Sequence, residues 1–225
     1  MKYTFIGDVH GDADKLSRLI DRLELDGRTL IFLGDIVNHG PSSRSVIERL
    51  LTLKDDGVQI QLVQGNHEAE LLDFIHNGDF VRFARVGGIP TIKSYVSCAM
   101  DDVHRQFASE FPATHYDFIV NSKLFVEDDS WIASHAGIDP LAPYKRDISV
   151  LRDGVHESLF ERSPTLSKPV IFGHYAQKSF QPFCRENVIC VDTGCGMLNG
   201  PLTALLYPEM EFLQVGATKC LRISK

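Results

Sequence analysis

The sequence predicts an α/β protein in which βαβ units build a largely parallel sheet. Three short and mostly apolar segments, residues 3–6, 30–33 and 60–63, each end in a glycine turn that carries Asp, His or Asn. Segments with helical periodicity separate them, and this alternation is typical of parallel strands joined by crossover helices. Ligands bind at the carboxyl ends of such strands, so the three turns predict one functional site.

The first third of the chain gives the clearest pattern. Strands are expected at residues 2–7, 29–33 and 58–63. An amphipathic helix is expected over residues 13–25, because Leu16, Leu19, Ile20 and Leu23 recur at helical spacing. Pro41 favours the start of a second helix, since proline is well tolerated in a first turn. A third helix is expected through residues 71–75.

The pattern loosens over residues 74–129, where Gly87, Gly88 and Pro90 interrupt it. A helix is expected over residues 100–111, and we interpret 74–129 as a cap-like region beside the site. A further helix is expected at 148–160, and strands at 130–134, 169–172, 187–191, 202–207 and 211–215. The turn at 192–196 has the composition of a hairpin. With neither a linker nor a repeat, residues 1–225 predict a single domain.

Composition limits the function classes. The net charge of −7 and the isoelectric point near 5.7 argue against a nucleic-acid-binding surface. No apolar stretch approaches the roughly 20 residues of a membrane span, and the first residues lack the pattern of a signal peptide. The five cysteines lack metal-site spacing and are interpreted as reduced thiols. We therefore expect a cytoplasmic protein without membrane or nucleic-acid partners, and its oligomeric state stays open.

The side chains at the strand ends form a candidate metal site. Carboxylate, imidazole and amide ligands in one set suit Mn, Fe or Zn. Asp8 and His10 point to the same side of an extended backbone and can bind one ion, and Asp35 can bridge to a second. A single strand-end Asp or His is usually a cap, but five such turns in one chain favour a site. The set is Asp8, His10, Asp35, Asn66, His67, His135 and His174.

Four other histidines have no comparable neighbours in the sequence. We interpret them as solvated or core residues: His76, His104, His115 and His156.

These motifs resemble the metallophosphoesterase superfamily, and within it the serine/threonine phosphoprotein phosphatase branch. The matching segments are residues 7–11, 34–40, 65–68, 135–137 and 173–174. The resemblance implies a four-layer α/β/β/α sandwich of the calcineurin-like type and two divalent ions, most simply Mn, with Fe or Zn as alternatives. It places Asp8, His10 and Asp35 on one ion, and Asp35, Asn66, His135 and His174 on the other.

The resemblance also implies catalytic roles. His67 would be the general acid that protonates the leaving oxygen, and Arg152 would bind phosphate, with Arg146 and Arg162 as reserves. Two positions depart from the family pattern. Asn38 replaces an orienting Asp; it can accept a hydrogen bond from His67 but cannot stabilise its cationic form as a carboxylate would.

His39 replaces a phosphate-binding Arg, and an imidazole cannot reproduce the charged guanidinium fork. Because the metal ligands are complete, we expect weakened or redirected catalysis.

Three functions follow as hypotheses. The leading one is a dinuclear metal-dependent phosphatase that hydrolyses phosphomonoesters, including phosphoserine or phosphothreonine in proteins, by attack of a metal-bound hydroxide. Tyr175-Ala176 after His174, in place of the second His of nuclease-type members, favours it. The alternative, suggested by Asn38 and Gly40-Pro41, is a symmetrical tetraphosphatase that splits diadenosine tetraphosphate into ADP. The third is a catalytically impaired binding module.

Overall fold

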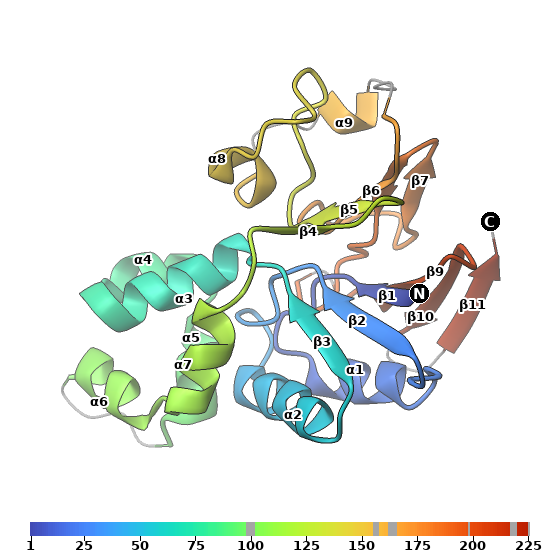
Figure 1. Ribbon diagram of the computed structural model, residues 1–225. Coiled ribbons are helices and arrows are strands. Elements are labelled where there is room, and N and C mark those ends of the chain that lie inside the picture. Colours follow the sequence, from blue (N-terminus) through green and yellow to red (C-terminus); the bar gives the residue numbers. More distant parts are fainter. Residues whose placement is uncertain (98–101, 155–157, 162–165, 198, 217–219, 225) are drawn as a thin grey trace.

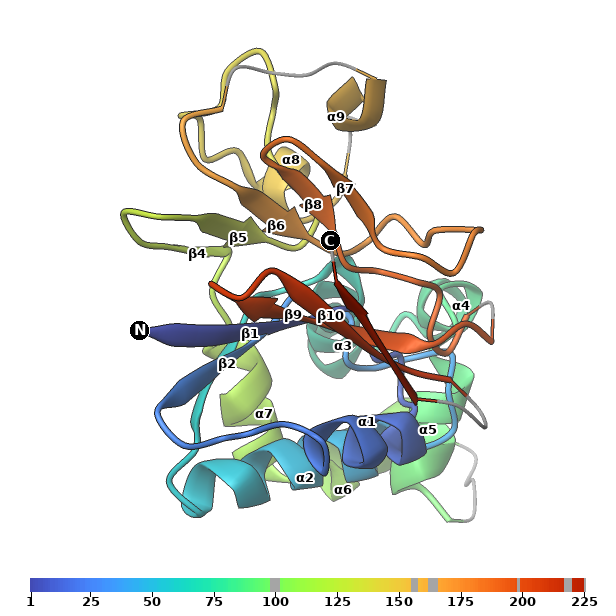
Figure 2. The same ribbon diagram turned by 90° about the vertical axis from the view of Figure 1, so that its right-hand side faces the viewer.

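Two β-sheets lie face to face, and helices cover the outer side of each sheet (Figure 1). The computed structural model describes residues 1–225 except 98–101, 155–157, 162–165, 198, 217–219 and 225. The second view shows the same stacking, with α1 and α2 below the first sheet and α8 and α9 above the second (Figure 2). The four-layer α/β/β/α sandwich is therefore confirmed.

The first sheet has six strands in the order β11-β10-β9-β1-β2-β3. Its parallel half is β1 (Lys2–Ile6), β2 (Arg28–Phe32) and β3 (Gln59–Leu62), connected by α1 (Ala13–Ile20) and α2 (Ser43–Asp55). Its antiparallel half is β9 (Leu202–Tyr207), β10 (Glu211–Val215) and β11 (Cys220–Ser224). The sheet is thus mixed, because the C-terminal strands return as hairpins beside β1.

The second sheet has five strands in the order β4-β5-β6-β8-β7. Its central strands are parallel: β5 (Ile132–Ser134), β6 (Val170–Phe172) and β8 (Val188–Cys190). Its antiparallel edges are β4 (Phe125–Glu127) and β7 (Phe183–Arg185). The short helices α8 (Ile148–Leu151) and α9 (Ser158–Glu161) lie on the outer side of this sheet (Figure 1).

The core has three parts, one between each pair of neighbouring layers. Successive strand residues point to opposite faces, so Phe5 and Ile31 enter the space between the sheets, whereas Ile6 and Leu30 face the helices. Trp131 fills the space between the sheets, with its ring at 4.9 Å and 79° to the ring of Phe5. Burial on both faces explains why these strands are almost continuously apolar.

The described part of the region between β3 and β4 contains five helices. They are α3 (Asn66–Asn77), α4 (Phe80–Arg85), α5 (Ile89–Tyr95), α6 (Val103–Glu110) and α7 (Ala113–Val120). Phe83 and Phe107 belong to the same apolar core as Leu16 of α1. This region extends the helical layer of the first sheet, and its role as a cap stays a prediction. Among the described residues, no helix has the length and apolar character to cross a membrane.

Three predicted elements differ from the structure. The first helix ends at Ile20, because the chain turns there to begin β2 at Arg28. The helix predicted over residues 148–160 is interrupted after α8, since Gly154 adopts a left-handed φ of +68° and packs against the His174 ring. The 192–196 turn is not a hairpin: it leads from β8 in one sheet to β9 in the other.

Candidate metal centre

The six predicted metal ligands converge at one edge of the sandwich. Asp8 and His10 follow β1, Asp35 follows β2, Asn66 begins α3, His135 follows β5 and His174 follows β6. Strands of both sheets therefore deliver side chains to the same place. Two groups of ligand atoms, each within 4.8 Å of one another, share Asp35: Asp8 with His10 and Asp35, and Asp35 with His135 and His174.

The group around His135 is the tighter of the two. Its Nε2 lies 3.2 Å from Asp35 Oδ2, 3.1 Å from Asn66 Oδ1 and 3.1 Å from His174 Nδ1. His174 Nδ1 is also 3.1 Å from Asn66 Oδ1. One carboxylate, one amide oxygen and two imidazoles thus converge on one point, and this donor set fits a divalent transition metal.

The second group is more open. His10 Nε2 lies 3.9 Å from both Asp8 Oδ2 and Asp35 Oδ2. Asp35 therefore faces both groups, as a carboxylate that bridges two ions must. The ligand assignment from the sequence agrees with this geometry and stays a prediction until an ion is located.

Backbone carbonyls determine which imidazole nitrogen faces the centre. His135 Nδ1 donates to Leu33 O at 2.7 Å, and His10 Nδ1 donates to Val37 O at 3.1 Å. Since a carbonyl can only accept, both rings carry a proton on Nδ1 and direct Nε2 toward the carboxylates. Such outer partners of ligating histidines are a regular feature of metal sites.

The backbone at the centre is held in rarely populated conformations. His10, Asp35, Asn38, His39 and His174 have φ between +45° and +69°, which costs about 1–3 kcal/mol for each such residue. Neighbouring glycines allow the close approach, because a Cβ at Gly65 would overlap the Asp35 carboxylate and one at Gly173 would overlap Asp8. Strain of this kind concentrates where side chains must be aimed at a ligand.

Glu68 supports the centre in a way that the sequence analysis missed. Its fully buried carboxylate accepts from the backbone N–H of Asp35 at 2.7 Å, of Gly65 at 2.9 Å and of Ile36 at 2.9 Å. It therefore fastens the β2 turn to the start of α3. Its place beside Asn66 and His67 was visible in the sequence, but these backbone contacts were not.

Asp192 is a second buried carboxylate that was missed. It follows β8 in the same way as Asp8 follows β1, and apolar Val188–Cys190 and Gly194 flank it as the earlier strands and glycines flank their acids. Interpreting 192–196 as a hairpin hid this pattern. In the structure Gly194 N–H donates to Asp192 Oδ1 at 2.9 Å, and Asp192 interacts with Asp8.

The charges of the centre call for a cation. Burial, then Asp192, raises the pKa of Asp8 well above its usual value, and burial raises the pKa of Asp192 to about 6. Burial opposes charge on His135, yet Asp35 and Asp8 raise its pKa to about 10. Among the described residues, the salt bridges of Asp8 and Asp35 involve only histidines. A divalent ion fits this unbalanced carboxylate set.

The predicted catalytic residues occupy different positions. His67 Nε2 lies 3.8 Å from Asp35 Oδ2, and its ring contacts those of His10 and His39 at 4.9 and 5.0 Å. Asn38 Nδ2 lies 3.0 Å from His67 Nδ1. The amide nitrogen therefore faces the ring, whereas the sequence predicts that Asn38 accepts a hydrogen bond from His67.

Two of the predicted phosphate-binding arginines form ion pairs with acidic side chains. The Arg152 guanidinium is bound by the Asp153 carboxylate, with Nε–Oδ1 at 2.7 Å, and Arg146 binds Glu127 at 3.1 Å. No hydrogen bond links Arg152 to the strand-end cluster in the described part of the chain. Arg162 and His156 lie outside the described residues. His76, His104 and His115 lie among the α3–α7 helices, away from the centre.

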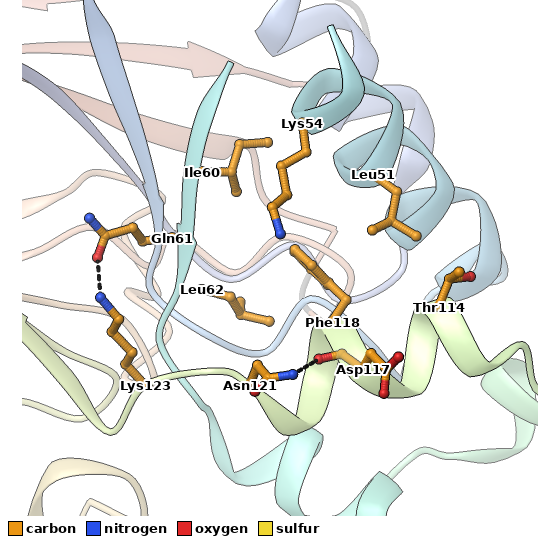
Figure 3. Close-up of a pocket in the computed structure, with 10 residues that line it drawn as sticks. All are labelled: Leu51, Lys54, Ile60, Gln61, Leu62, Thr114, Asp117, Phe118, Asn121 and Lys123. Atoms are coloured by element: carbon orange, nitrogen blue, oxygen red, sulfur yellow. Dashed lines mark hydrogen bonds between the residues drawn. The ribbon is translucent and has the colours of Figure 1, made fainter. Parts of the chain in front are cut away.

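A hollow of about 460 Å³ between α2, β3 and α7 is separate from this centre (Figure 3). Its walls combine apolar and polar side chains, and Lys123 Nζ donates to Gln61 Oε1 at 3.0 Å beside it. None of the strand-end side chains lines it. The chemistry therefore belongs to the metal centre.

Comparison with known proteins places the chain in a family. The calcineurin-like phosphoesterase pattern matches residues 1–189. The asymmetrical bis(5'-nucleosyl)-tetraphosphatase PrpE of Bacillus subtilis (strain 168) is 27% identical over 244 residues, covering 96% of this chain and 94% of that protein. The zinc-dependent endopolyphosphatase of Saccharomyces cerevisiae (strain ATCC 204508 / S288c) is 29% identical over 159 residues, 62% of this chain and 48% of that protein.

A solved structure described as a candidate diadenosine tetraphosphatase has the same fold, with a TM-score of 0.67 and 20% identity, covering 97% of this chain and 95% of that one. The family pattern spans most of the 225 residues and includes the ends of β1, β2, β5 and β6. The chain is therefore a member of the calcineurin-like phosphoesterase family and a metal-dependent phosphoester hydrolase.

Proposed function

We propose that the protein hydrolyses dinucleoside polyphosphates, and that it splits diadenosine tetraphosphate with water into ATP and AMP. The observation that carries this proposal is the contact between Asn38 and His67. It bears on the leaving group, which is the main chemical difference between a phosphoanhydride and a phosphoserine.

Asn38 presents an amide N–H to His67 Nδ1 at 3.0 Å, so Nδ1 accepts and does not donate. An aspartate at this position would accept from Nδ1–H and stabilise the positively charged imidazole, which is the stronger proton donor. The Nδ1 side of the His67 ring therefore lacks the carboxylate acceptor that an aspartate would supply. Proton donation to a leaving group is correspondingly weaker.

Weak proton donation matters little for a phosphoanhydride. The leaving oxygen of a nucleotide phosphate ionises at about pH 6. The serine hydroxyl has a pKa near 15, so that its alkoxide is about as basic as hydroxide and is a much poorer leaving group. Cleavage of a phosphoserine needs the proton, and cleavage of a polyphosphate chain does not. The site geometry thus favours the phosphoanhydride substrate over the phosphoprotein that the sequence analysis placed first.

The relatives support the same substrate class. The full-length relative is named as an asymmetrical bis(5'-nucleosyl)-tetraphosphatase, and the partial relative as an endopolyphosphatase. The alternative hypothesis drawn from the sequence was symmetrical cleavage into ADP. We propose the asymmetrical products because the relative with the greater coverage carries that description.

Six side chains would bind the metal ions, and His67 would contact the substrate. Asp8, His10 and Asp35 would hold one divalent ion, and Asp35, Asn66, His135 and His174 the other; Mn fits this mixed set of oxygen and nitrogen ligands, and Fe or Zn is compatible. The bound pair would supply a hydroxide nucleophile at neutral pH and neutralise phosphate charge. His67 would donate a hydrogen bond from Nε2 to the reacting phosphate.

The test is product analysis with Mn²⁺-loaded protein and diadenosine tetraphosphate, separated by anion-exchange chromatography. Equal amounts of ATP and AMP are expected, and ADP alone would show symmetrical cleavage. His135→Ala, which removes a proposed ligand, is the negative control, and His76→Ala, an exposed histidine away from the centre, is the matched positive control. Intact dinucleotide beside rapid turnover of a phosphoserine peptide would refute the proposal and restore the phosphoprotein hypothesis.

A further inference from the structure

Behind the Asn38–His67 pair lies a small network of buried hydroxyl groups. Thr91 on α5 and Ser43 at the start of α2 are fully buried, as is Asn38. Thr91 Oγ1 lies 2.8 Å from Asn38 Oδ1 and 2.8 Å from Ser43 Oγ. The Asn38 backbone N–H points at both hydroxyls, at 3.0 Å from Thr91 Oγ1 and 3.2 Å from Ser43 Oγ.

Counting protons decides which way the Asn38 amide points. With Oδ1 toward Thr91, the Thr91 hydroxyl donates to Oδ1, and Ser43 donates to Thr91 Oγ1. The two lone pairs of Thr91 Oγ1 then accept from Ser43 and from the Asn38 backbone. Both hydroxyl protons, the Asn38 backbone N–H and Asn38 Oδ1 then have partners, as the groups of a buried polar network require.

The opposite orientation leaves a proton without a partner. With Nδ2 toward Thr91, both lone pairs of Thr91 Oγ1 accept from Asn38, and its own proton goes to Ser43 Oγ. The Ser43 hydroxyl proton then has no acceptor, because Asn38 N and Thr91 Oγ1 are its only hydrogen-bond neighbours within the described residues. An unsatisfied buried hydroxyl is costly, so the network selects the first orientation.

We propose that Thr91, supported by Ser43, is a positioning residue that fixes the Asn38 amide and, through it, the tautomer of His67. The amide NH₂ then donates to His67 Nδ1, and the ring proton resides on Nε2, the nitrogen that lies 3.8 Å from Asp35 Oδ2. His67 thereby offers a hydrogen-bond donor to a phosphate oxygen while its ring is neutral.

This inference rests on the proposed function for its consequence, the selection of substrates with good leaving groups. It extends the site to α5, in the region that the sequence analysis described only as a cap. Thr91 does not touch the reacting atoms, and its effect passes through Asn38.

The first experiment is a double-mutant cycle on Mn²⁺-loaded protein. Thr91→Val keeps the shape and removes the hydroxyl, and we expect kcat for diadenosine tetraphosphate to fall about tenfold, the effect of one lost polar contact. Thr91→Ser should restore kcat to within about twofold. In the Asn38→Ala background Thr91→Val should add no further loss, since its route to His67 is gone. If the double variant instead loses kcat by the product of the two separate losses, the proposal is overturned and Thr91 acts only in packing.

The second experiment reads the tautomer directly. Nitrogen NMR of ¹⁵N-histidine-labelled, Zn²⁺-loaded protein should show His67 with a bare Nδ1 and a protonated Nε2, with the signals assigned by loss in His67→Gln. A proton on Nδ1 in the unmutated protein would overturn the proposal, even if Thr91→Val fails to fold.

The two proposals can be refuted separately. Absence of dinucleotide hydrolysis refutes the proposed function. The role of Thr91 is still tested by the NMR spectrum of His67 and by the double-mutant cycle measured with bis(p-nitrophenyl) phosphate.

Discussion

Replacing Glu68 by Gln tests how the metal centre is supported. The carboxylate accepts three backbone N–H groups, two at Oε2 from Asp35 and Gly65 and one at Oε1 from Ile36. A glutamine can keep its single carbonyl oxygen at the Oε2 position. Its NH₂ group then faces the Ile36 N–H, so that two donors oppose each other in a site with no exposure.

The expected loss follows from these contacts. Each buried donor without a partner costs about 1–3 kcal/mol, so two opposed donors predict a loss of about 2–6 kcal/mol in the free energy of unfolding. That is a large part of the 5–15 kcal/mol that stabilises a typical domain. Because Ile36, the residue after Asp35, loses its backbone partner, the turn that carries Asp35 is less firmly held, and Mn²⁺ affinity should also fall, by about tenfold.

The assay is urea unfolding of metal-free protein, followed by a chelator competition for Mn²⁺. Glu48→Gln is the matched control, because Glu48 is an exposed residue paired with Arg44 at the surface. A loss of less than about 0.5 kcal/mol in Glu68→Gln, the range of ordinary surface substitutions, would refute the reasoning, since the carboxylate would then contribute nothing specific.

Three further outcomes are expected. Removing the metals with a chelator should lower the melting temperature by about 5–10 °C, since an ion at a hundredfold its Kd stabilises by about 2.7 kcal/mol; an unchanged melting curve would contradict the metal site. Asp192→Ala should weaken Mn²⁺ binding about tenfold by removing the carboxylate beside Asp8, with the retained oxygen of Asp192→Asn giving a smaller loss; equal affinity in all three proteins would contradict it. Burial lowers the pKa of His115 below its usual 6.5. Below pH 6.5 the unfolded chain therefore takes up a proton that the native protein does not, and the free energy of unfolding decreases as the pH decreases. Replacing His115, whose Nδ1 lies 2.8 Å from Tyr95 OH, with Phe should reduce the loss of stability between pH 7 and 5.5, measured by urea unfolding; identical pH profiles would count against this explanation.

The strand-end residues were predictable because their pattern is local. An apolar strand that ends in an acid and a glycine is visible at Asp8 and Asp35 without any knowledge of the fold. The same rule identifies Asp192, which was overlooked because 192–196 has the composition of a hairpin. Turn composition alone does not reveal whether the next strand joins the same sheet or the other one.

Thr91 and Glu68 act through contacts that no local sequence pattern predicts. Thr91 reaches Asn38 across 53 positions of the chain, and Glu68 reaches Asp35 across 33. Both interactions depend on backbone groups that gain partners only when α5 and α3 pack against the β2 turn. The phosphate-binding role of Arg152 stays a prediction, and the structure shows its side chain paired with the neighbouring Asp153.

The sequence by itself determined the fold class, the family resemblance and the six predicted metal ligands, because each depends on residue type and spacing along the chain. Only the tertiary structure decided that the Asn38 amide presents its nitrogen to His67, that Glu68 fastens the Asp35 backbone, and that Asp192 joins Asp8. These features arise where segments far apart in the chain bury polar groups together. Each buried group must then find a partner, and the fold alone decides which partner it finds.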